Sequence, residues 1–322
     1  MNRIKRRVGS TLLLTFMMFG FSGLTANAAD YPSRPIDLIV NFGPGGGADG
    51  MGRTVAKLLG PVLNVSIPAS NVAGAAGNTG LTKVANSKAD GYTIGTMTGL
   101  TVSSWAAGMG SLTPEDFSYL AVVQSSPSML YAPKGSQFTS YQDVLDYTKA
   151  NPGTVRVATA GMGTLDDLTL KFLGTKGHEM KNIPYSKPAE RYIAPLGGHT
   201  ELIYEEPGDV AQFLESGQMT PLVVFSTERH ARFPDVPSSF EFGHEISFPN
   251  WRAVVAPAGV PADQLNVLNG AMAKVLAHAD WKEYCAVKFS CVGPRSPAES
   301  LEFVNKQYQD LSKFMKQFGL TE

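Results

Sequence analysis

The sequence has few charged residues and no long run of basic ones. Of its 322 residues only 17% are charged, and 27 Lys and Arg against 28 Asp and Glu give a formal net charge of -1. Beyond the first seven residues, Lys and Arg do not cluster. A nucleic-acid interface needs a basic surface for the phosphates, so this composition argues against nucleic-acid binding. With 43% hydrophobic residues the chain can bury a core, which excludes a disordered protein.

Cysteine is also scarce, because Cys285 and Cys291 are the only two in the chain. No His or third Cys accompanies them at a metal-ligand spacing, so we expect no metal site there. In an oxidising compartment the pair could close a small loop, and otherwise the two would be buried thiols. The spacing leaves both alternatives open.

Common catalytic motifs are missing. The sequence contains no G-x-S-x-G, no H-E-x-x-H and no S-x-x-K in a suitable context, and its five His residues are scattered. We therefore expect no catalytic residue, no metal and no cofactor. A triad built from distant residues is recognised only by geometry, so a secreted hydrolase stays as one alternative.

The first 28 residues have the pattern of an export signal. Basic residues at 3–7 precede an apolar stretch at 8–24, and Ala26-Asn27-Ala28 matches a cleavage site. The stretch is interrupted by Gly and Ser, whereas a membrane span wants about 20 apolar residues. Removal of 1–28 would leave 23 basic and 28 acidic residues, a net charge of -5. We predict a cleaved signal peptide and a mature protein outside the cytosol.

Strand-like and helix-like segments alternate along the rest of the chain. The β-branched run 36–42 leads through a glycine turn at 43–49 into a helical pattern. The run 154–158 leads likewise into a glycine turn at 161–164 and a helix. Further strands are predicted at 221–225 and 253–256, and further helices at 140–150, 262–278 and 297–318. This alternation predicts an α/β fold.

The last of these helices has the clearest boundaries. Ser296-Pro297-Ala298-Glu299 forms a capping-box pattern with Pro at the first helical position, and Gly319 follows the last apolar residue. Its apolar residues make one stripe, which packing against a core explains.

The two glycine turns are where chemistry is expected. Glycine allows a close approach of the backbone to a ligand, and the unpaired N–H groups of the first helical turn attract anions. Two such turns facing each other could hold a small carboxylate. The first turn is not G-x-G-x-x-G and no P-loop Lys follows, so nucleotide binding is not supported.

The chain from 31 to 320 resembles the periplasmic substrate-binding proteins of tripartite tricarboxylate transporters, the Bug receptors. The resemblance rests on the order and spacing of short segments spread over almost the whole length. These segments are 31–36, 42–49, 71–78, 89–93, 161–164, 183–185, 196–199, 233–237 and 251–261.

The resemblance implies a type II-like periplasmic-binding-protein fold with two lobes that close on a ligand cleft between them, like a hinged clamp. The expected division is a signal peptide at 1–28, a first lobe of 29–127 plus 249–322, and a second lobe of 128–248. It also implies a periplasmic monomer that binds a small organic acid and transiently contacts the permease subunits of a membrane transporter.

The same resemblance implies which residues hold the carboxylate. The first loop contributes Gly45, Gly46, Gly47 and Asp49. The second contributes Thr159, Ala160, Gly161, Gly163 and Thr164. Asp49 and Thr164 also stand where helix caps belong, so capping is an alternative role. Tyr185 is the aromatic residue that we expect to line the pocket.

The chain departs from the family pattern in two places. Asp167 and Lys171 replace a His and a Glu that often follow the second loop, and Asp167 fits a capping role. Glu205 and Glu206 stand where relatives have an apolar residue followed by Asp or Asn. Two carboxylates beside an anion site would repel the anion, so we predict that one of them contacts an amino, amide or hydroxyl group of the ligand. The alternative is that at least one faces solvent or caps the following helix.

Three functions stay open at this point. The first is a receptor that delivers a small organic carboxylate to a permease. The second is the same fold used as a sensor for a signalling partner. The third is the secreted hydrolase already mentioned.

Overall fold

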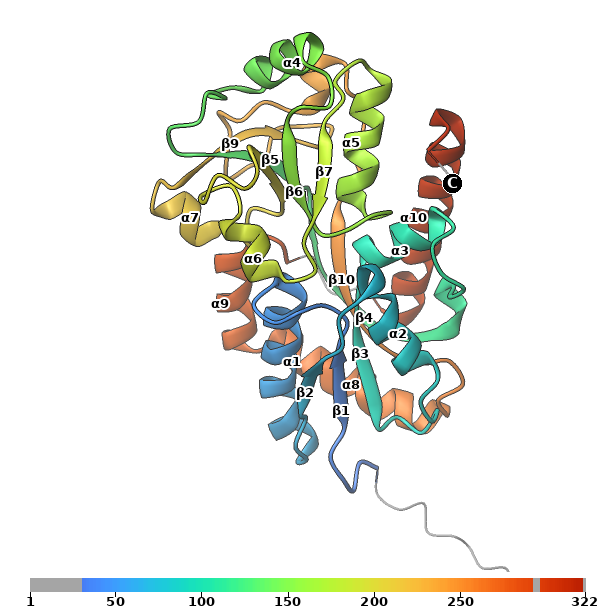
Figure 1. Cartoon of the computed structure of the whole chain (residues 1–322). Coiled ribbons are helices and arrows are strands. Elements are labelled where there is room, and N and C mark those ends of the chain that lie inside the picture. Colours follow the sequence, from blue (N-terminus) through green and yellow to red (C-terminus); the bar gives the residue numbers. More distant parts are fainter. Residues whose placement is uncertain (1–30, 292–295, 321–322) are drawn as a thin grey trace, which may run out of the picture. The chain divides into compact units, whose positions relative to one another are not determined.

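The computed structural model describes residues 31–291 and 296–320, and its frame consists of two five-stranded sheets (Figure 1). The first sheet has the order β2-β1-β3-β10-β4. The neighbours β2, β1 and β3 are parallel, whereas β10 is antiparallel to both β3 and β4. Its strands are β1 (Asp37–Val40), β2 (Ala69–Asn71), β3 (Thr93–Thr98), β4 (Phe117–Ser126) and β10 (Asn250–Pro257).

The second sheet repeats this pattern with the order β7-β6-β8-β5-β9. Here β7, β6 and β8 are parallel, and β5 is antiparallel to β8 and β9. Its strands are β5 (Met129–Pro133), β6 (Arg156–Thr159), β7 (Lys181–Pro184), β8 (Leu202–Glu205) and β9 (Met219–Val224).

Helices cover both sheets. On the first sheet α1 packs against α8, and α10 packs against β4 and α3. On the second sheet α5 packs beside β7, α6 beside β6 and α7 beside β9. The helices are α1 (Gly47–Leu63), α2 (Asn78–Ala85), α3 (Gly99–Ala106), α4 (Tyr141–Ala150), α5 (Leu165–Thr175), α6 (Pro188–Ile193), α7 (Ala211–Glu215), α8 (Ala262–Ala277), α9 (Ala279–Lys288) and α10 (Pro297–Phe318). Short 3-10 turns lie at Ala75–Gly77, Pro114–Asp116 and Ser239–Phe242.

The predicted α/β fold with two lobes is confirmed, since each lobe is built on one sheet. The first sheet takes its strands from 37–126 and 250–257, and the second from 129–224. The chain crosses between the sheets at Pro127-Ser128 and again between β9 and β10. The lobe limits themselves, 29–127 plus 249–322 and 128–248, stay a prediction.

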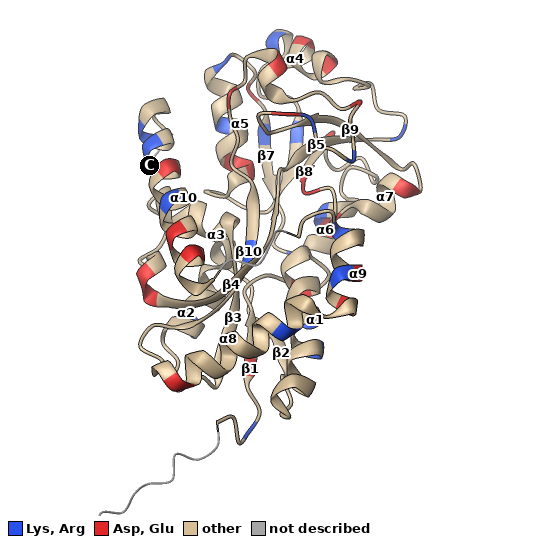
Figure 2. Ribbon diagram, turned by 180° about the vertical axis from the view of Figure 1, so that it is seen from behind, with Lys and Arg blue, Asp and Glu red and all other residues tan. Residues whose placement is uncertain are grey.

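Local signals account for the helix ends. The Ser296 side chain accepts a hydrogen bond from the Glu299 amide, the Glu299 side chain returns one to the Ser296 amide, and Gly319 ends α10 with a φ of 64°. On its inner face, Val304, Leu311 and Met315 are at most 1% exposed. In Figure 2 basic and acidic residues are interspersed on the outer surfaces of α4 and α10, which leaves those surfaces to solvent.

Three clusters of buried side chains hold the layers together. One lies under the second sheet and also includes Leu100, Leu311 and Met315 from α3 and α10. Another fills the first sheet around the fully buried Trp251. The third packs Tyr131, Ile203 and Val224 against α6 and its neighbours. Since helices of the first lobe share a cluster with the second sheet, apolar packing joins the lobes beside the crossing strands.

The structure settles the cysteine question, because Cys285 and Cys291 form a disulfide with an S–S distance of 2.07 Å. The predicted signal peptide, 1–28, lies outside the described residues. Within the part of the chain that the structure describes, no helix is both long and apolar enough to cross a membrane.

Candidate ligand-binding site

A cavity of about 20 Å³ lies between the two sheets, at the start of α1. From the first lobe, the turn after β1, the turn after β3 and the start of β10 line it. From the second lobe, α6 and the turn after β8 close it. The lining residues are Phe42, Gly46, Gly47, Ala48, Thr98, Leu100, Pro188, Arg191, Glu206, Asp209, Asn250 and Arg252.

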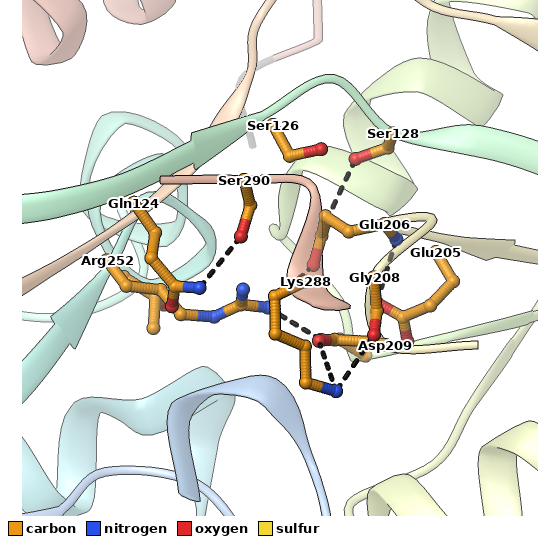
Figure 3. A network of polar contacts seen from close by, with 12 residues as sticks. Gln124, Ser126, Ser128, Glu205, Glu206, Gly208, Asp209, Arg252, Lys288 and Ser290 are labelled. Carbon is orange, nitrogen blue, oxygen red and sulfur yellow. Dashed lines mark hydrogen bonds and ion pairs between the residues drawn. The ribbon is translucent and has the colours of Figure 1, made fainter. Parts of the chain in front are cut away.

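A buried network of charged side chains forms one wall of this cavity (Figure 3). Nη2 of Arg252, on β10, donates to Glu206 Oε2 at 2.9 Å and to Asp209 Oδ2 at 2.6 Å. Ser128 Oγ donates to the other Glu206 oxygen at 3.0 Å. The three charged side chains are at most 6% exposed. Arg252 therefore ties the first sheet to the turn after β8.

Glu205 faces a second guanidinium. Arg191, on α6, donates to Glu205 Oε2 through Nε at 3.0 Å and also through Nη2. The Glu206 amide donates to Glu205 Oε1 at 3.0 Å. All four carboxylate oxygens of Glu205 and Glu206 thus accept a hydrogen bond from the chain itself.

These contacts decide one alternative and leave another open. Glu205 is 3% and Glu206 2% exposed, so the idea that one of them faces solvent is wrong. A lone buried carboxylate would be costly, and the two guanidinium groups supply the compensating charge. Contact of either carboxylate with a ligand stays a prediction.

The acidic residues also show what holds the arginines charged. Burial acts to lower the pKa of Arg252, but Asp209 and Glu206 outweigh this effect and raise the pKa above its ordinary value. Asp166, on α5, has no such direct partner. Burial raises its pKa to about 7, against the effects of Arg191 and of the Ala160 amide, which donates to Asp166 Oδ2 at 2.7 Å.

The first glycine loop is capped by its own helix. Gly45 has a φ of 84°, and its amide donates to Asp49 Oδ2 at 3.0 Å. Arg53 and Asn71 donate to the other oxygen of Asp49, each at 2.8 Å. The capping role of Asp49 is confirmed, and a ligand contact of Asp49 stays a prediction.

Two further glycines of this loop are needed for packing across the lobes. A Cβ atom at Gly47 would collide with Arg252 Nη2 and Asp209 Oδ2, and one at Gly46 would lie 2.7 Å from Pro188 Cγ. Glycine thus lets the ion pair and α6 approach the start of α1.

The second glycine loop is built like the first. The Gly163 amide donates to Asp167 Oδ2 at 2.9 Å, so the capping role predicted for Asp167 is confirmed. Lys171 pairs with the same carboxylate at 3.0 Å. Thr164 occupies the N-cap position, but its hydroxyl donates to Gly161 O at 2.7 Å, and the expected side-chain cap by Thr164 is wrong. Its chain carbonyl already satisfies this hydroxyl.

The structure does not bring both loops to one cavity. Gly46, Gly47 and Glu206 line the cavity beside α1, whereas the predicted second-loop residues are absent from its described lining. Gly163 O accepts from Ser103 Oγ at 3.0 Å, and Thr159 Oγ1 donates to Asn182. A separate cavity of about 250 Å³ beside the second loop is lined by Ala75, Ala76, Asn78, Ser104, Met109, Gly110 and Met162.

Tyr185 lies at the edge of the second sheet. Its amide donates to Thr159 O at 2.9 Å, and its half-buried ring packs against the cluster that contains Tyr131 and Ile203. This position explains the ring by packing, and a role in lining the ligand pocket stays a prediction.

Four residues of the cavity were not selected by sequence reasoning. Asn250 and Arg252 are polar residues within an otherwise apolar buried strand, which is a usable signal. Asp209 follows Glu205 and Glu206 closely enough to have been grouped with them. Arg191 lies in a six-residue helix, and its sequence context carries no such signal.

One group of side chains has the composition of a cation site. Carboxylate oxygens of Glu205, Glu206 and Asp209 lie within 4.8 Å of one another. Arg191 and Arg252 already bind these three side chains, so an added cation would have to displace a guanidinium.

A larger hollow of about 630 Å³ lies away from this network, between α5, β7 and the end of α10. Its lining includes Met162, Leu170, Met180 and Leu320. The convergent ion pairs and helix starts are at the smaller cavity, so we place the candidate site there.

Comparison with known proteins agrees with this architecture. Residues 51–320 match the family model described as "Tripartite tricarboxylate transporter family receptor", TctC. The chain is 28% identical over 302 residues to Protein BugT of Bordetella pertussis, covering 91% of this chain and 92% of BugT. Two solved structures, periplasmic binding protein BugD and R. palustris Rpa4515 with adipate, are each 25% identical with a TM-score of 0.83, covering 90% of this chain and 99% of theirs. The chain therefore belongs to the TctC family of tripartite tricarboxylate transporter receptors, to which the Bug proteins are similar.

Proposed function

We propose that this protein is a periplasmic receptor that binds a small organic carboxylate between its lobes and delivers it to a tripartite tricarboxylate-type permease. The observation that carries the proposal is the cavity at the start of α1, which residues of both lobes line. Family membership supports the receptor role. Delivery by a monomer in the periplasm is the finer part of the proposal, and the predicted signal peptide supports it.

The start of α1 suits a carboxylate. Gly46 is the N-cap and contributes no side-chain hydrogen bond, so the first amides of this 17-residue helix are available to an anion. Arg191 and Arg252 offset the negative charge of Glu205, Glu206 and Asp209. The ligand thus meets amide dipoles rather than unpaired negative charge.

Binding requires the lobes to separate. A cavity of about 20 Å³ has room for about one water, which is far less than an organic acid needs. Pro188 and Arg191 on the second lobe face Gly46 and Gly47 on the first. We propose that movement about the two chain crossings opens this contact, and that the second glycine loop takes the distal end of the ligand.

The role predicted for Glu205 and Glu206 can be tested with neutral isosteres. If either carboxylate contacts the ligand, Glu205→Gln or Glu206→Gln changes affinity by about tenfold for ligands that bear a donor group. Isothermal titration calorimetry measures this change. Affinity and selectivity unchanged in both variants would rule the role out.

A thermal-shift screen tests the receptor function itself. Purified protein is heated with mono-, di- and tricarboxylates, aromatic acids, amino acids and their amides. A ligand at 100 times its Kd stabilises the fold by about 2.7 kcal/mol, which raises the Tm by several degrees. Stabilisation by carboxylates alone supports the proposal.

Two outcomes would count against it. Turnover of ester or amide substrates would favour the hydrolase alternative. No shift with any acid, in protein that has been unfolded and refolded to remove a copurified ligand, would contradict carboxylate binding.

A further inference from the structure

Asn250 is a buried amide that faces the cavity. It is the first residue of β10 and only 3% exposed. Within residues 31–291 and 296–320, neither its Oδ1 nor its Nδ2 has a hydrogen-bond partner. Most buried polar side-chain atoms are paired in folded proteins, so an amide with both ends unpaired beside a cavity points to a molecule that the cavity receives.

Other polar atoms around the same cavity are also unpaired among the described residues. Arg252 Nε is one, although Nη2 of the same side chain is fully used by Glu206 and Asp209. The Tyr192 hydroxyl is another, and it lies 3.6 Å from the position of a Cβ atom on Gly46. Asn250 thus belongs to a group of hydrogen-bonding atoms at the start of α1.

We propose that Asn250 is a specificity-determining residue that recognises an uncharged hydrogen-bonding substituent, a hydroxyl or a carboxamide, on a small carboxylic acid. This inference rests on the proposed receptor function. It assigns the ligand to the hydroxy acids or carbamoyl acids rather than to plain dicarboxylates.

The chemistry of the amide selects this class. Asn presents a donor and an acceptor side by side, and a hydroxyl or carboxamide can satisfy both. An ammonium group would satisfy Oδ1 and leave Nδ2 unpaired. A second carboxylate would satisfy Nδ2 and repel Oδ1.

The charges nearby favour an uncharged substituent too. The positive charges of Arg252 and Arg191 are already paired with Glu206, Asp209 and Glu205. No unpaired arginine charge of this network is left to attract a second anionic group. The ligand's single carboxylate is then taken by the amides at the start of α1.

Calorimetry with matched ligands tests the inference. Succinate, malate, succinamate and aspartate differ in one substituent, and adipate with adipamate gives a longer pair. We expect malate or succinamate, or adipamate in the longer pair, to bind at least about tenfold more tightly than the unsubstituted acid. In Asn250→Leu this preference falls to within about twofold, while the plain acid loses less than about threefold.

Two variants serve as controls. Asn266→Leu replaces an exposed Asn on α8 and should keep the wild-type preference. Asn250→Asp removes the Nδ2 donor with little change in shape, so it tests the same point if Asn250→Leu does not fold. We expect it to lose at least about threefold of the preference.

The outcomes separate this inference from the receptor function. Plain and substituted acids that bind wild type equally, or a preference that survives in the Asn250 variants, would overturn the inference and leave the receptor function standing. A preference for aspartate above all others would overturn the uncharged class. No binding of any acid would overturn both.

Discussion

At the scale of single residues, glycine and acidic side chains at the starts of two helices define the candidate site. Gly45 and Gly163 both take a positive φ, and each amide is bonded to the Asp four residues later. The sequence therefore predicts the loop geometry well. It does not reveal that Gly47 faces an ion pair, because Arg252 is 205 positions away in the chain.

Gly47→Ala tests whether this glycine serves packing. The added methyl group would collide with the Arg252–Asp209 pair, and overpacking of this kind costs about 1–3 kcal/mol. We expect a lower urea midpoint with an unchanged slope. Gly270→Ala on α8, where a Cβ atom meets nothing within 4 Å, should instead stabilise the protein by about 0.5–1 kcal/mol. Equal effects of the two variants would contradict the packing role.

Asp166 gives a pH prediction. Its pKa is raised to about 7 by burial, so the folded protein binds this proton more tightly than the unfolded chain. Its contribution to stability is complete below about pH 4 and is lost as the pH rises through 7. Between pH 5 and 8 this loss amounts to about 2–3 kcal/mol.

The measurement is urea unfolding of wild type and Asp166→Asn at both pH values. The Asn variant keeps an acceptor for the Ala160 amide but cannot ionise, so it should be the more stable protein at pH 8 relative to pH 5. Parallel pH profiles for the two proteins would show that Asp166 does not titrate in this range.

At the scale of elements, the segment that follows α9 links the disulfide to the site. Lys288 Nζ donates to Gly208 O at 2.8 Å, and Gln124 Nε2 donates to Ser290 Oγ at 2.7 Å. Both contacts lie between Cys285 and Cys291 in the chain. Figure 3 shows this segment between β4 and the turn that carries Glu206 and Asp209. The disulfide therefore closes a loop that supports the ion-pair network.

Removal of the disulfide should have a moderate effect. Closing so short a loop is worth about 2 kcal/mol in the chain-entropy description. We expect Cys285→Ser/Cys291→Ser to lower the Tm by several degrees, and a reductant to lower the wild-type Tm similarly. The double variant is its own control, because reductant should leave its Tm unchanged. A wild-type Tm insensitive to complete reduction would contradict the prediction.

At the scale of the whole molecule, buried charge connects the lobes. Arg252 lies on the first sheet, whereas Glu206 and Asp209 follow β8 of the second. Loss of one partner leaves uncompensated buried charge, which costs about 3–5 kcal/mol. Arg252→Met should therefore destabilise the protein by about this amount.

A compensating variant separates charge from packing. Arg252→Met/Glu206→Gln/Asp209→Asn removes both signs of charge, and we expect it to recover at least about half of the lost stability. Urea unfolding measures both proteins. A triple variant as unstable as Arg252→Met would show that the guanidinium acts by its shape.

Local patterns in the sequence determined the α/β class, the helix boundaries and the glycine loops. The capping box and Gly319 bound α10 through contacts between near neighbours, and alternating apolar segments suffice to place β1, β6 and β10. Trp251 was expected in the hinge or core, and it is fully buried in the core of the first sheet.

Only the tertiary structure decided which polar side chains meet. Arg191, Glu205, Glu206, Asp209 and Arg252 come from three separate elements, and their pairing depends on how the two sheets lie beside the chain crossings. The disulfide was equally undecided by spacing, because it depends on the turn between α9 and Cys291. Short-range rules fix local geometry, whereas charge pairing and burial are properties of residues that are distant in the sequence and adjacent in space.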